Sequence, residues 1–244
     1  MGKIAVITGA SGGIGAAVAR RLAAGGYRLV LGCCRHGEKA EALAQELRAG
    51  GAEAVAFCAD VSDTNEAAAL IQCAVDTYGG LDVLINNAGI AQIKLFTDIT
   101  PEEWRRMFAV NVDGIYNTCR AAVPIMVRQH SGSIVNVSSI WGLTGASCEV
   151  HYSAAKAAVI GFTKALAKEL GPSFINVNCV APGAIDTEMN AHLTAEERRA
   201  FEQEIPLERF GTPEEAAAAI AFLAGDGARY ITGQVISPNG GIVI

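Results

Sequence analysis

The chain has 244 residues, 51% of them hydrophobic, and a net charge of -6. This length suits one large α/β domain, and the scattered Lys and Arg residues exclude the clustered positive surface that nucleic-acid binding needs. No apolar run reaches the roughly 18 residues of a membrane helix, and residues 3–8 predict a strand rather than a secretion signal. We therefore expect a single domain over residues 1–244, located in the cytoplasm, with no nucleic-acid or membrane partner.

The spacing of the cysteines and histidines gives little support to metal binding. The seven cysteines include no C-x-x-C pair, and the four histidines are not spaced as a ligand pair. We expect reduced thiols and no metal site.

Short β-branched or aliphatic runs alternate with amphipathic stretches along the chain. The runs cover residues 4–8, 28–33, 54–58, 83–86, 133–138, 175–181 and 234–237. The helical patterns cover residues 13–24, 37–49, 65–78, 101–128, 152–170 and 213–224. Nearly continuous apolar strands are typical of a parallel sheet covered on both faces. The order predicts an α/β fold: one Rossmann-type, doubly wound parallel sheet of about seven strands with helices on both faces.

Residues 186–211 interrupt this alternation with a long insertion that contains a charged helical piece at residues 194–199. Long insertions in compact domains often cover a binding site. The segment is expected to be a substrate lid, with a surface excursion of no functional role as the alternative.

The first predicted strand leads through a glycine-rich turn into a helix. In such a turn, glycine lets the backbone approach a pyrophosphate on the N-terminus of the helix, whereas the alternative is merely a tight turn. The candidate cofactor-binding residues here are Thr8, Gly9, Ser11, Gly13, Ile14 and Gly15. The ends of the third and fourth strands add Asp60, Val61, Asn87, Ala88 and Gly89. Asn87 has an alternative role as a turn amide.

The end of the second strand bears on the choice of dinucleotide. NAD enzymes usually place a carboxylate there to bond the ribose hydroxyls, but residues 32–36 contain none. Arg35 could instead pair with a 2′-phosphate. This pattern favours NADP(H).

Tyr152 and Lys156 are four residues apart in a predicted helix. That spacing places them on one face, where the ammonium is expected to lower the pKa of the phenol from about 10. Tyr152 could then exchange a proton with a substrate. A solvated surface pair is the alternative.

Six motifs occur in order over essentially the whole chain. They are Thr8-Gly9-x-x-x-Gly13-x-Gly15, Asn86-Asn87-Ala88-Gly89, Asn111, Ser139, Tyr152-x-x-x-Lys156 and Pro182-Gly183-x-Ile185-x-Thr187. Together they resemble the short-chain dehydrogenase/reductase family, and most closely its 3-oxoacyl-acyl-carrier-protein reductase branch. The resemblance implies an NADPH-dependent enzyme, usually a homotetramer, that reduces a ketone to a secondary alcohol, possibly with the ketone carried on a protein.

The resemblance also implies roles for individual residues. Ser139 would polarise the substrate carbonyl, Tyr152 would deliver the proton, and Lys156 would lower the pKa of Tyr152 and bind the nicotinamide ribose. Asn111 would anchor a water that relays protons to Lys156, with a backbone-bonding helix amide as the alternative. The nicotinamide carboxamide would be met by the segment that contains Pro182, Gly183, Ile185 and Thr187.

One departure from the family pattern and one further resemblance concern the substrate. The family's carrier-docking basic residues, near the mouth of the site, align at about His130 and Ser173, and neither is a firm cation. Residues 138–150 resemble a subgroup that reduces the 5-aminopentanone group on a lysine of elongation factor P. There Glu149 would provide a counter-charge for an amine, unless it is an exposed loop carboxylate. A non-catalytic NADP(H) sensor is the alternative from another functional class.

Overall fold

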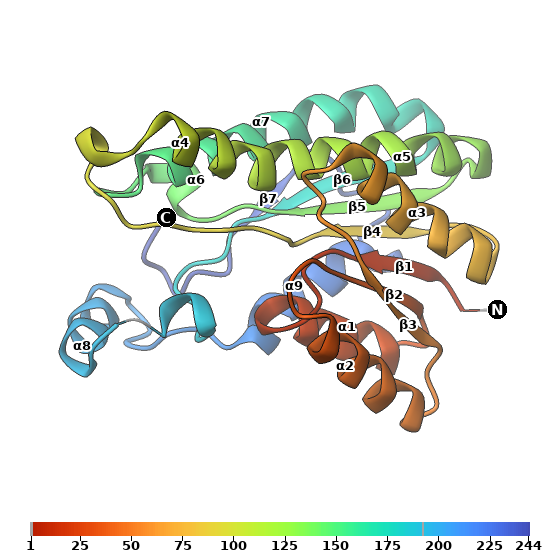
Figure 1. Ribbon diagram of the computed structural model, residues 1–244, viewed down its shortest axis with the longest axis horizontal. Helices are drawn as coiled ribbons and strands as arrows, with labels where there is room; N and C mark the ends of the chain where they lie inside the picture. Colours follow the sequence, from red (N-terminus) through yellow and green to blue (C-terminus); the bar gives the residue numbers. More distant parts are fainter. Residues whose placement is uncertain (1, 192) are drawn as a thin grey trace.

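A computed structural model describes residues 2–191 and 193–244. One sheet of seven strands has the order β3-β2-β1-β4-β5-β6-β7, and its neighbouring strands are parallel (Figure 1). The strands are β1 Ile4–Ile7, β2 Arg28–Cys33, β3 Ala54–Cys58, β4 Val83–Asn86, β5 Gly132–Val137, β6 Ile175–Val180 and β7 Val235–Ile236. The predicted α/β fold with a doubly wound parallel sheet is confirmed.

Helices cover both faces of the sheet (Figure 1). One layer contains α1 Gly13–Ala24, α2 Gly37–Ala49 and α9 Pro213–Ala224, and the other contains α3 Thr64–Tyr78, α4 Pro101–Phe108, α5 Gly114–Gln129 and α7 Val150–Leu170. Successive side chains of a strand enter opposite layers. In β1, Ala5 and Ile7 pack in the core under α1 and α9, whereas Ile4 and Val6 pack in the core under α3 and α5. This two-sided burial explains why the strands are almost entirely apolar.

The long helix predicted over residues 101–128 is interrupted. α4 and α5 are separated by a π-helical segment, Ala109–Asp113, whose wider turn contains Asn111. Hydrophobic periodicity does not detect one extra residue in a turn, and such turns are frequent at functional sites. A short helix that was not predicted, α6 Trp141–Thr144, follows β5.

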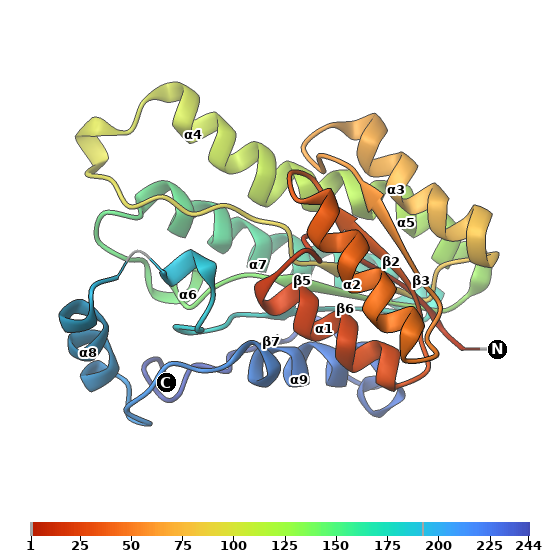
Figure 2. The ribbon, with the colours of Figure 1, turned by 60° about the horizontal axis from the view of Figure 1, so that its bottom comes forward.

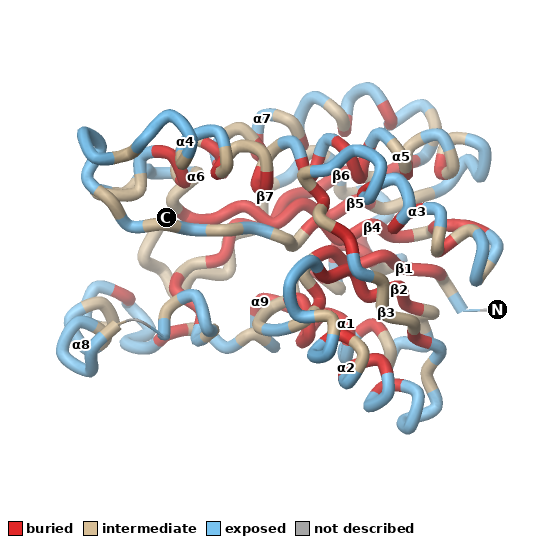
Figure 3. The backbone as a smooth tube through the Cα atoms, viewed as in Figure 1, coloured by how far each residue is buried: buried red, intermediate tan, exposed pale blue. Residues whose placement is uncertain are grey.

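The insertion at residues 186–211 contains a 3-10 turn, Glu188–Asn190, and α8 Ala195–Glu204. Figure 2 shows α8 beside the C-terminus and apart from α1 and α2. Ala184, Ile205 and Phe210 form a small apolar cluster under it. α8 has no fully buried residue, in contrast to the sheet (Figure 3). His192 lies outside the described residues.

Three further observations concern the described part of the chain. None of its helices is both long and apolar enough to cross a membrane. The described residues contain no His, Cys, Asp and Glu cluster suited to a metal ion. All seven cysteines are free thiols, and Cys33, Cys119 and Cys179 are buried.

Candidate functional site

The glycine-rich turn is packed so closely that side chains are excluded at two positions. A Cβ on Gly15 would lie 2.2 Å from the carbonyl oxygen of Gly9. Gly9 itself has a φ of +64°, and a Cβ there would lie 2.9 Å from Ala88 Cα. Thr8 joins the turn to the end of β4, because its hydroxyl accepts hydrogen bonds from the backbone N–H groups of Asn87 and Ala88 at 3.0 Å. The turn therefore holds the ends of β1 and β4 together.

The helix that follows this turn presents free donors. α1 begins at Gly13, its N-cap Gly12 makes no side-chain capping bond, and its first turn has no acidic residue. The first amides of a helix have no partner within the helix, and the helix dipole favours an anion at this end. The backbone here fits a pyrophosphate.

A cavity of about 330 Å³ opens over the turn and runs to the ends of β4 and β5; we call it the dinucleotide cleft. Predicted site residues that line it are Gly9, Ser11, Gly13, Ile14, Asn87, Ala88, Gly89, Asn111, Ser139, Tyr152, Lys156, Pro182, Gly183, Ile185 and Thr187. Asn87 also makes the turn contacts of its alternative role, since its amide donates to Thr8 and Gly9 carbonyls at 3.1 and 3.0 Å. The lining fits a bound dinucleotide.

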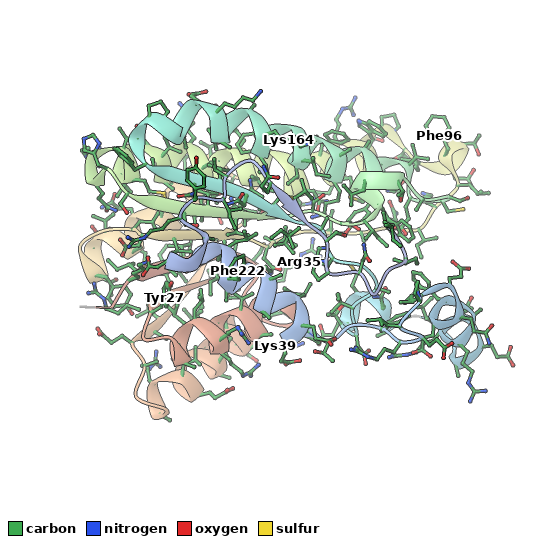
Figure 4. All side chains as sticks on the ribbon, turned by 180° about the vertical axis from the view of Figure 1, so that it is seen from behind. Tyr27, Arg35, Lys39, Phe96, Lys164 and Phe222 are labelled. Carbon is green, nitrogen blue, oxygen red and sulfur yellow. The ribbon has the colours of Figure 1, made fainter. Side chains whose placement is uncertain are left out.

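Five predicted residues do not line the cleft. Thr8 and Gly15 belong to the close packing of the glycine-rich turn itself, and the other three are Asp60, Val61 and Arg35. The carboxylate of Asp60 accepts hydrogen bonds from Ser62 and pairs with Arg106 at 3.3 Å. Val61 is buried against Gly114. Arg35 is exposed directly after β2 (Figure 4). Their contact with a cofactor remains a prediction.

Tyr152 and Lys156 share one face of the first turns of α7, as predicted. The Nζ of Lys156 lies 5.7 Å from the centre of the Tyr152 ring. It also donates to the carbonyl oxygen of Val137, at the end of β5, at 3.0 Å. Both side chains are buried, with 7% and 4% exposure. The alternative of a solvated surface pair is therefore wrong.

The sequence predicted a lowered pKa for Tyr152, and this prediction is also wrong for the chain alone. Burial raises the pKa of Tyr152 to about 12, against the opposing effect of a hydrogen bond with Ser139. Burial also lowers the pKa of Lys156 to about 8. The cause in both cases is the cost of placing a charge in the apolar interior. Tyr152 is therefore a protonated phenol at neutral pH, which is the form that can give a proton to a ketone oxygen.

Ser139 and Asn111 complete the group around the phenol. Ser139 follows β5, and its hydroxyl accepts a hydrogen bond from the Trp141 N–H at 3.2 Å. The Asn111 amide donates to the backbone carbonyls of Ile90 and Met107 at 3.0 Å, which is the alternative role considered for it. It also lines the dinucleotide cleft beside Lys156. Asn111 thus helps to shape the cleft wall.

A second cavity of about 380 Å³ meets the first at Ser139 and Tyr152; we call it the substrate pocket. Its apolar wall includes Trp141 and Phe201, whose rings stack with centroids 6.3 Å apart. Glu149 is half-buried in the lining, so its alternative as an exposed loop carboxylate is wrong.

Several residues of the substrate pocket were not predicted from the sequence. They are Ala91, Gln92, Ile93, Trp141, Met189, Asn190, Leu193 and Phe201. They come from three segments that are far apart in the chain, and no motif marks the segment at residues 91–93. For the other two segments the available signals were the subgroup resemblance of residues 138–150, which include Trp141, and the position of the insertion just after Ile185.

His130 and Ser173 lie at the wrong end of the sheet for the docking role implied by the resemblance. They come just before β5 and β6, whereas Ser139 follows the other end of β5. Six residues of strand, about 20 Å, separate the two edges. A third cavity, of about 970 Å³, also lies at this amino edge and is lined by His130 and Phe174. Within one chain, these positions are not near the mouth of the site.

The turn, the parallel sheet and the Ser139–Tyr152–Lys156 group define a dinucleotide-dependent oxidoreductase. The family model described as short chain dehydrogenase matches residues 3–198. The chain belongs to this family, and it is therefore an oxidoreductase that uses a nicotinamide cofactor to interconvert C=O and CH–OH groups.

Curated relatives match over nearly the full length. A 3-oxoacyl-[acyl-carrier-protein] reductase of Staphylococcus aureus is 43% identical over 242 residues, covering 99% of this chain and 98% of the relative. The enzyme of the same name from Synechocystis is 43% identical over 99% of this chain and 97% of its own length. That of Chlamydia trachomatis is 42% identical over 98% of this chain and 97% of its own length.

Proposed function

We propose that the protein is an NADPH-dependent ketone reductase of the 3-oxoacyl-[acyl-carrier-protein] reductase type. The observation that carries the proposal is the place where the two cavities meet. Tyr152 and Ser139 line both the dinucleotide cleft and the substrate pocket. A ketone in the pocket would therefore have the proton donor and the cofactor on adjacent sides. The names of the curated relatives support the 3-oxoacyl class.

Each site residue of the chain would have its own role at the substrate oxygen or the cofactor. Bound NADPH would supply a hydride to the carbonyl carbon. The hydroxyl of Ser139 would hold the carbonyl oxygen, and the protonated phenol of Tyr152 would give it a proton as negative charge develops. Lys156, fixed by the Val137 carbonyl, would bind the ribose and favour the phenolate that remains. Pro182, Gly183, Ile185 and Thr187 would close the nicotinamide end of the cleft.

The preference for NADPH over NADH belongs to the same proposal. Its support is the exposed Arg35 at the end of β2, in a segment that contains no carboxylate. An arginine can form a bidentate pair with a 2′-phosphate, and no acidic neighbour within residues 32–36 would repel that phosphate.

The direct test is NADPH oxidation with acetoacetyl thioesters of acyl carrier protein and of coenzyme A. The reaction is followed at about 340 nm, where the reduced nicotinamide ring absorbs. We expect turnover of both, with a higher kcat/KM on the carrier. Binding of NADPH without turnover of any ketone would instead support the sensor alternative.

A second candidate is reduction of the 5-aminopentanone group on elongation factor P, and Glu149 is the observation that favours it. The carboxylate of Glu149 lines the substrate pocket close enough to Tyr152 to raise the pKa of the phenol. An amine on the substrate would find a counter-charge there. The comparisons give this candidate no support of their own.

Replacement of Glu149 by Gln separates the two candidates. If the substrate carries an amine, Glu149→Gln should lower kcat/KM on aminopentanone-modified elongation factor P by about 10- to 100-fold, the value of one charged hydrogen bond. The same variant should change kcat/KM on acetoacetyl-CoA less than twofold. Equal losses on both substrates would exclude amine recognition by Glu149.

The wider organisation is also proposed. We infer one domain over residues 1–244 with a substrate lid at 186–211, a location in the cytoplasm, and a homotetramer that acts on a protein-borne ketone. The lid is supported by Leu193 and Phe201, which line the substrate pocket from the insertion. The tetramer is supported by half-buried apolar residues of α7 outside its buried stripe, including Phe162 and Leu166.

A further inference from the structure

A chain of hydrogen bonds joins the start of α7 to the wall of the substrate pocket. The Nε2 of His151, the neighbour of Tyr152, lies 3.0 Å from the Oε1 of Gln92. The Nε2 of Gln92 donates to Glu103 at 2.9 Å, and the ammonium of Lys94 donates to both oxygens of Glu103 at 2.8 Å. Gln92 is the member of this chain that lines the substrate pocket.

The charges at one end of this chain fix the orientation of the Gln92 amide. Hydrogen bonds from Lys94, the Thr100 backbone and Gln92 hold the pKa of Glu103 at about 2, so its carboxylate can only accept. The NH₂ group of Gln92 must therefore face Glu103, which leaves its carbonyl oxygen facing His151. His151 in turn must donate from Nε2.

The burial of His151 keeps it in that state. The side chain has 0% exposure, and its Nδ1 has no hydrogen-bond partner among the described residues. A proton on Nδ1 would be a buried donor without an acceptor, which is costly. Burial accordingly lowers the pKa of His151, the nearby carboxylate of Glu103 acts in the opposite direction, and Lys94 adds to the lowering. A neutral imidazole with its proton on Nε2 holds Gln92 from one side while Glu103 holds it from the other.

The loop that carries Gln92 is also fixed by its backbone. The N–H of Lys94 donates to the carbonyl of Cys148, just before α7, at 2.7 Å. Glu103 belongs to the capping box that starts α4. Gln92 is thus held between two helix starts, and its second amide N–H has no acceptor among the described residues. A preorganised donor of this kind loses little entropy when it binds a ligand.

We propose that Gln92 is a substrate-positioning residue that donates its second N–H to the thioester carbonyl of a 3-oxoacyl substrate, while Tyr152 and Ser139 bind the reacting ketone. The inference rests on the proposed function, and it names the part of the substrate that the pocket wall recognises. His151 acts through Gln92 by fixing the orientation of its amide.

The test uses two ketones of similar length, ethyl acetoacetate, which has a second carbonyl, and 2-hexanone, which does not. Gln92→Ala should lower kcat/KM for ethyl acetoacetate by about 3- to 10-fold, the value of one neutral hydrogen bond, mainly through KM. The change for 2-hexanone should be less than twofold, and KM for NADPH should not change. Gln72→Ala, in which an exposed glutamine on α3 is removed, is the matched control.

Variants of His151 test the positioning step. His151→Phe removes the donor to Gln92 and should reproduce the selective loss on ethyl acetoacetate. His151→Gln supplies an amide N–H and should restore much of it. A purely structural role for this chain of bonds would reduce activity on both ketones alike.

The outcomes separate this inference from the proposed function. If the wild-type protein oxidises NADPH with neither ketone nor with acetoacetyl-CoA, the proposed function fails. If the wild-type protein is active and Gln92→Ala loses the same factor on both ketones, or loses nothing, the role of Gln92 is overturned and the proposed function stands.

Discussion

The two ends of the dinucleotide cleft are built in different ways. At the end where we propose that the chemistry takes place, Tyr152 and Lys156 are buried, and Lys156 is bonded to the end of β5. Beyond the other end, where we propose that the adenosine binds, Arg35 and Lys39 are exposed (Figure 4), and Lys39 pairs with Glu188 of the insertion at 2.7 Å. Buried, preorganised groups support chemistry, whereas exposed charges are worth little to stability and rearrange readily around a ligand. The contrast predicts large effects on rate at one end and moderate effects on selectivity at the other.

The largest effect is expected at the phenol. Tyr152→Phe removes the proton donor and keeps the ring, so the fold and NADPH binding should be preserved. General acid catalysis contributes about 10²- to 10⁴-fold, and kcat should fall by that factor. Steady-state NADPH oxidation and fluorescence titration of NADPH measure the two properties. Unchanged kcat in this variant would end the catalytic assignment.

Lys156 should show opposite effects on activity and stability. Because the pKa of Lys156 is lowered to about 8 in the folded protein, its charge opposes folding below that pH. The unfolded chain binds the proton up to a pH of about 10.4, so the stability of the wild-type protein should rise between pH 8 and that value. Lys156→Met should lower kcat at least about 100-fold and raise the free energy of unfolding at pH 7 by about 2–3 kcal/mol.

Denaturant unfolding at pH 7 and at pH 10.5 checks this prediction. The advantage of Lys156→Met should shrink at the higher pH, because Lys156 is then neutral in the folded protein and about half deprotonated in the unfolded chain. Lys164→Met, an exposed lysine of the same helix (Figure 4), is the control and should show no such dependence on pH. A Lys156→Met variant less stable than wild type at pH 7 would contradict the burial argument.

A smaller and selective effect is expected at Arg35. Arg35→Ser should lower kcat/KM for NADPH by about 10- to 100-fold, as expected for loss of a charged hydrogen bond. The same variant should leave kcat/KM for NADH nearly unchanged. Arg120→Ser, an exposed arginine on α5, serves as the control. An unchanged ratio of kcat/KM for NADPH to kcat/KM for NADH would mean that Arg35 does not bind the 2′-phosphate.

The sequence predicted those parts of the molecule that depend on local pattern. The strands and the glycine-rich turn were found because apolar runs and the spacing of Gly9, Gly13 and Gly15 carry the information themselves. Most residues of the dinucleotide cleft followed from the same motifs.

Features that depend on tertiary packing could not be predicted in the same way. The raised pKa of Tyr152 follows from burial by elements remote in sequence, including the region around Met107. The substrate pocket joins Gln92, Trp141 and Phe201, which share no motif. The contact between His151 and Gln92 joins residues that are 59 positions apart, which no local pattern predicts.

The cavity of about 970 Å³ has a practical consequence for inhibitor design. It lies at the amino edge of the sheet, beside His130 and Phe174, and does not include Tyr152. A compound selected for this cavity by size could bind tightly and leave ketone turnover intact. Competitive inhibitors should instead be sought for the smaller substrate pocket, which Trp141 and Phe201 line together with Tyr152, because an occupant there would exclude the ketone from the phenol.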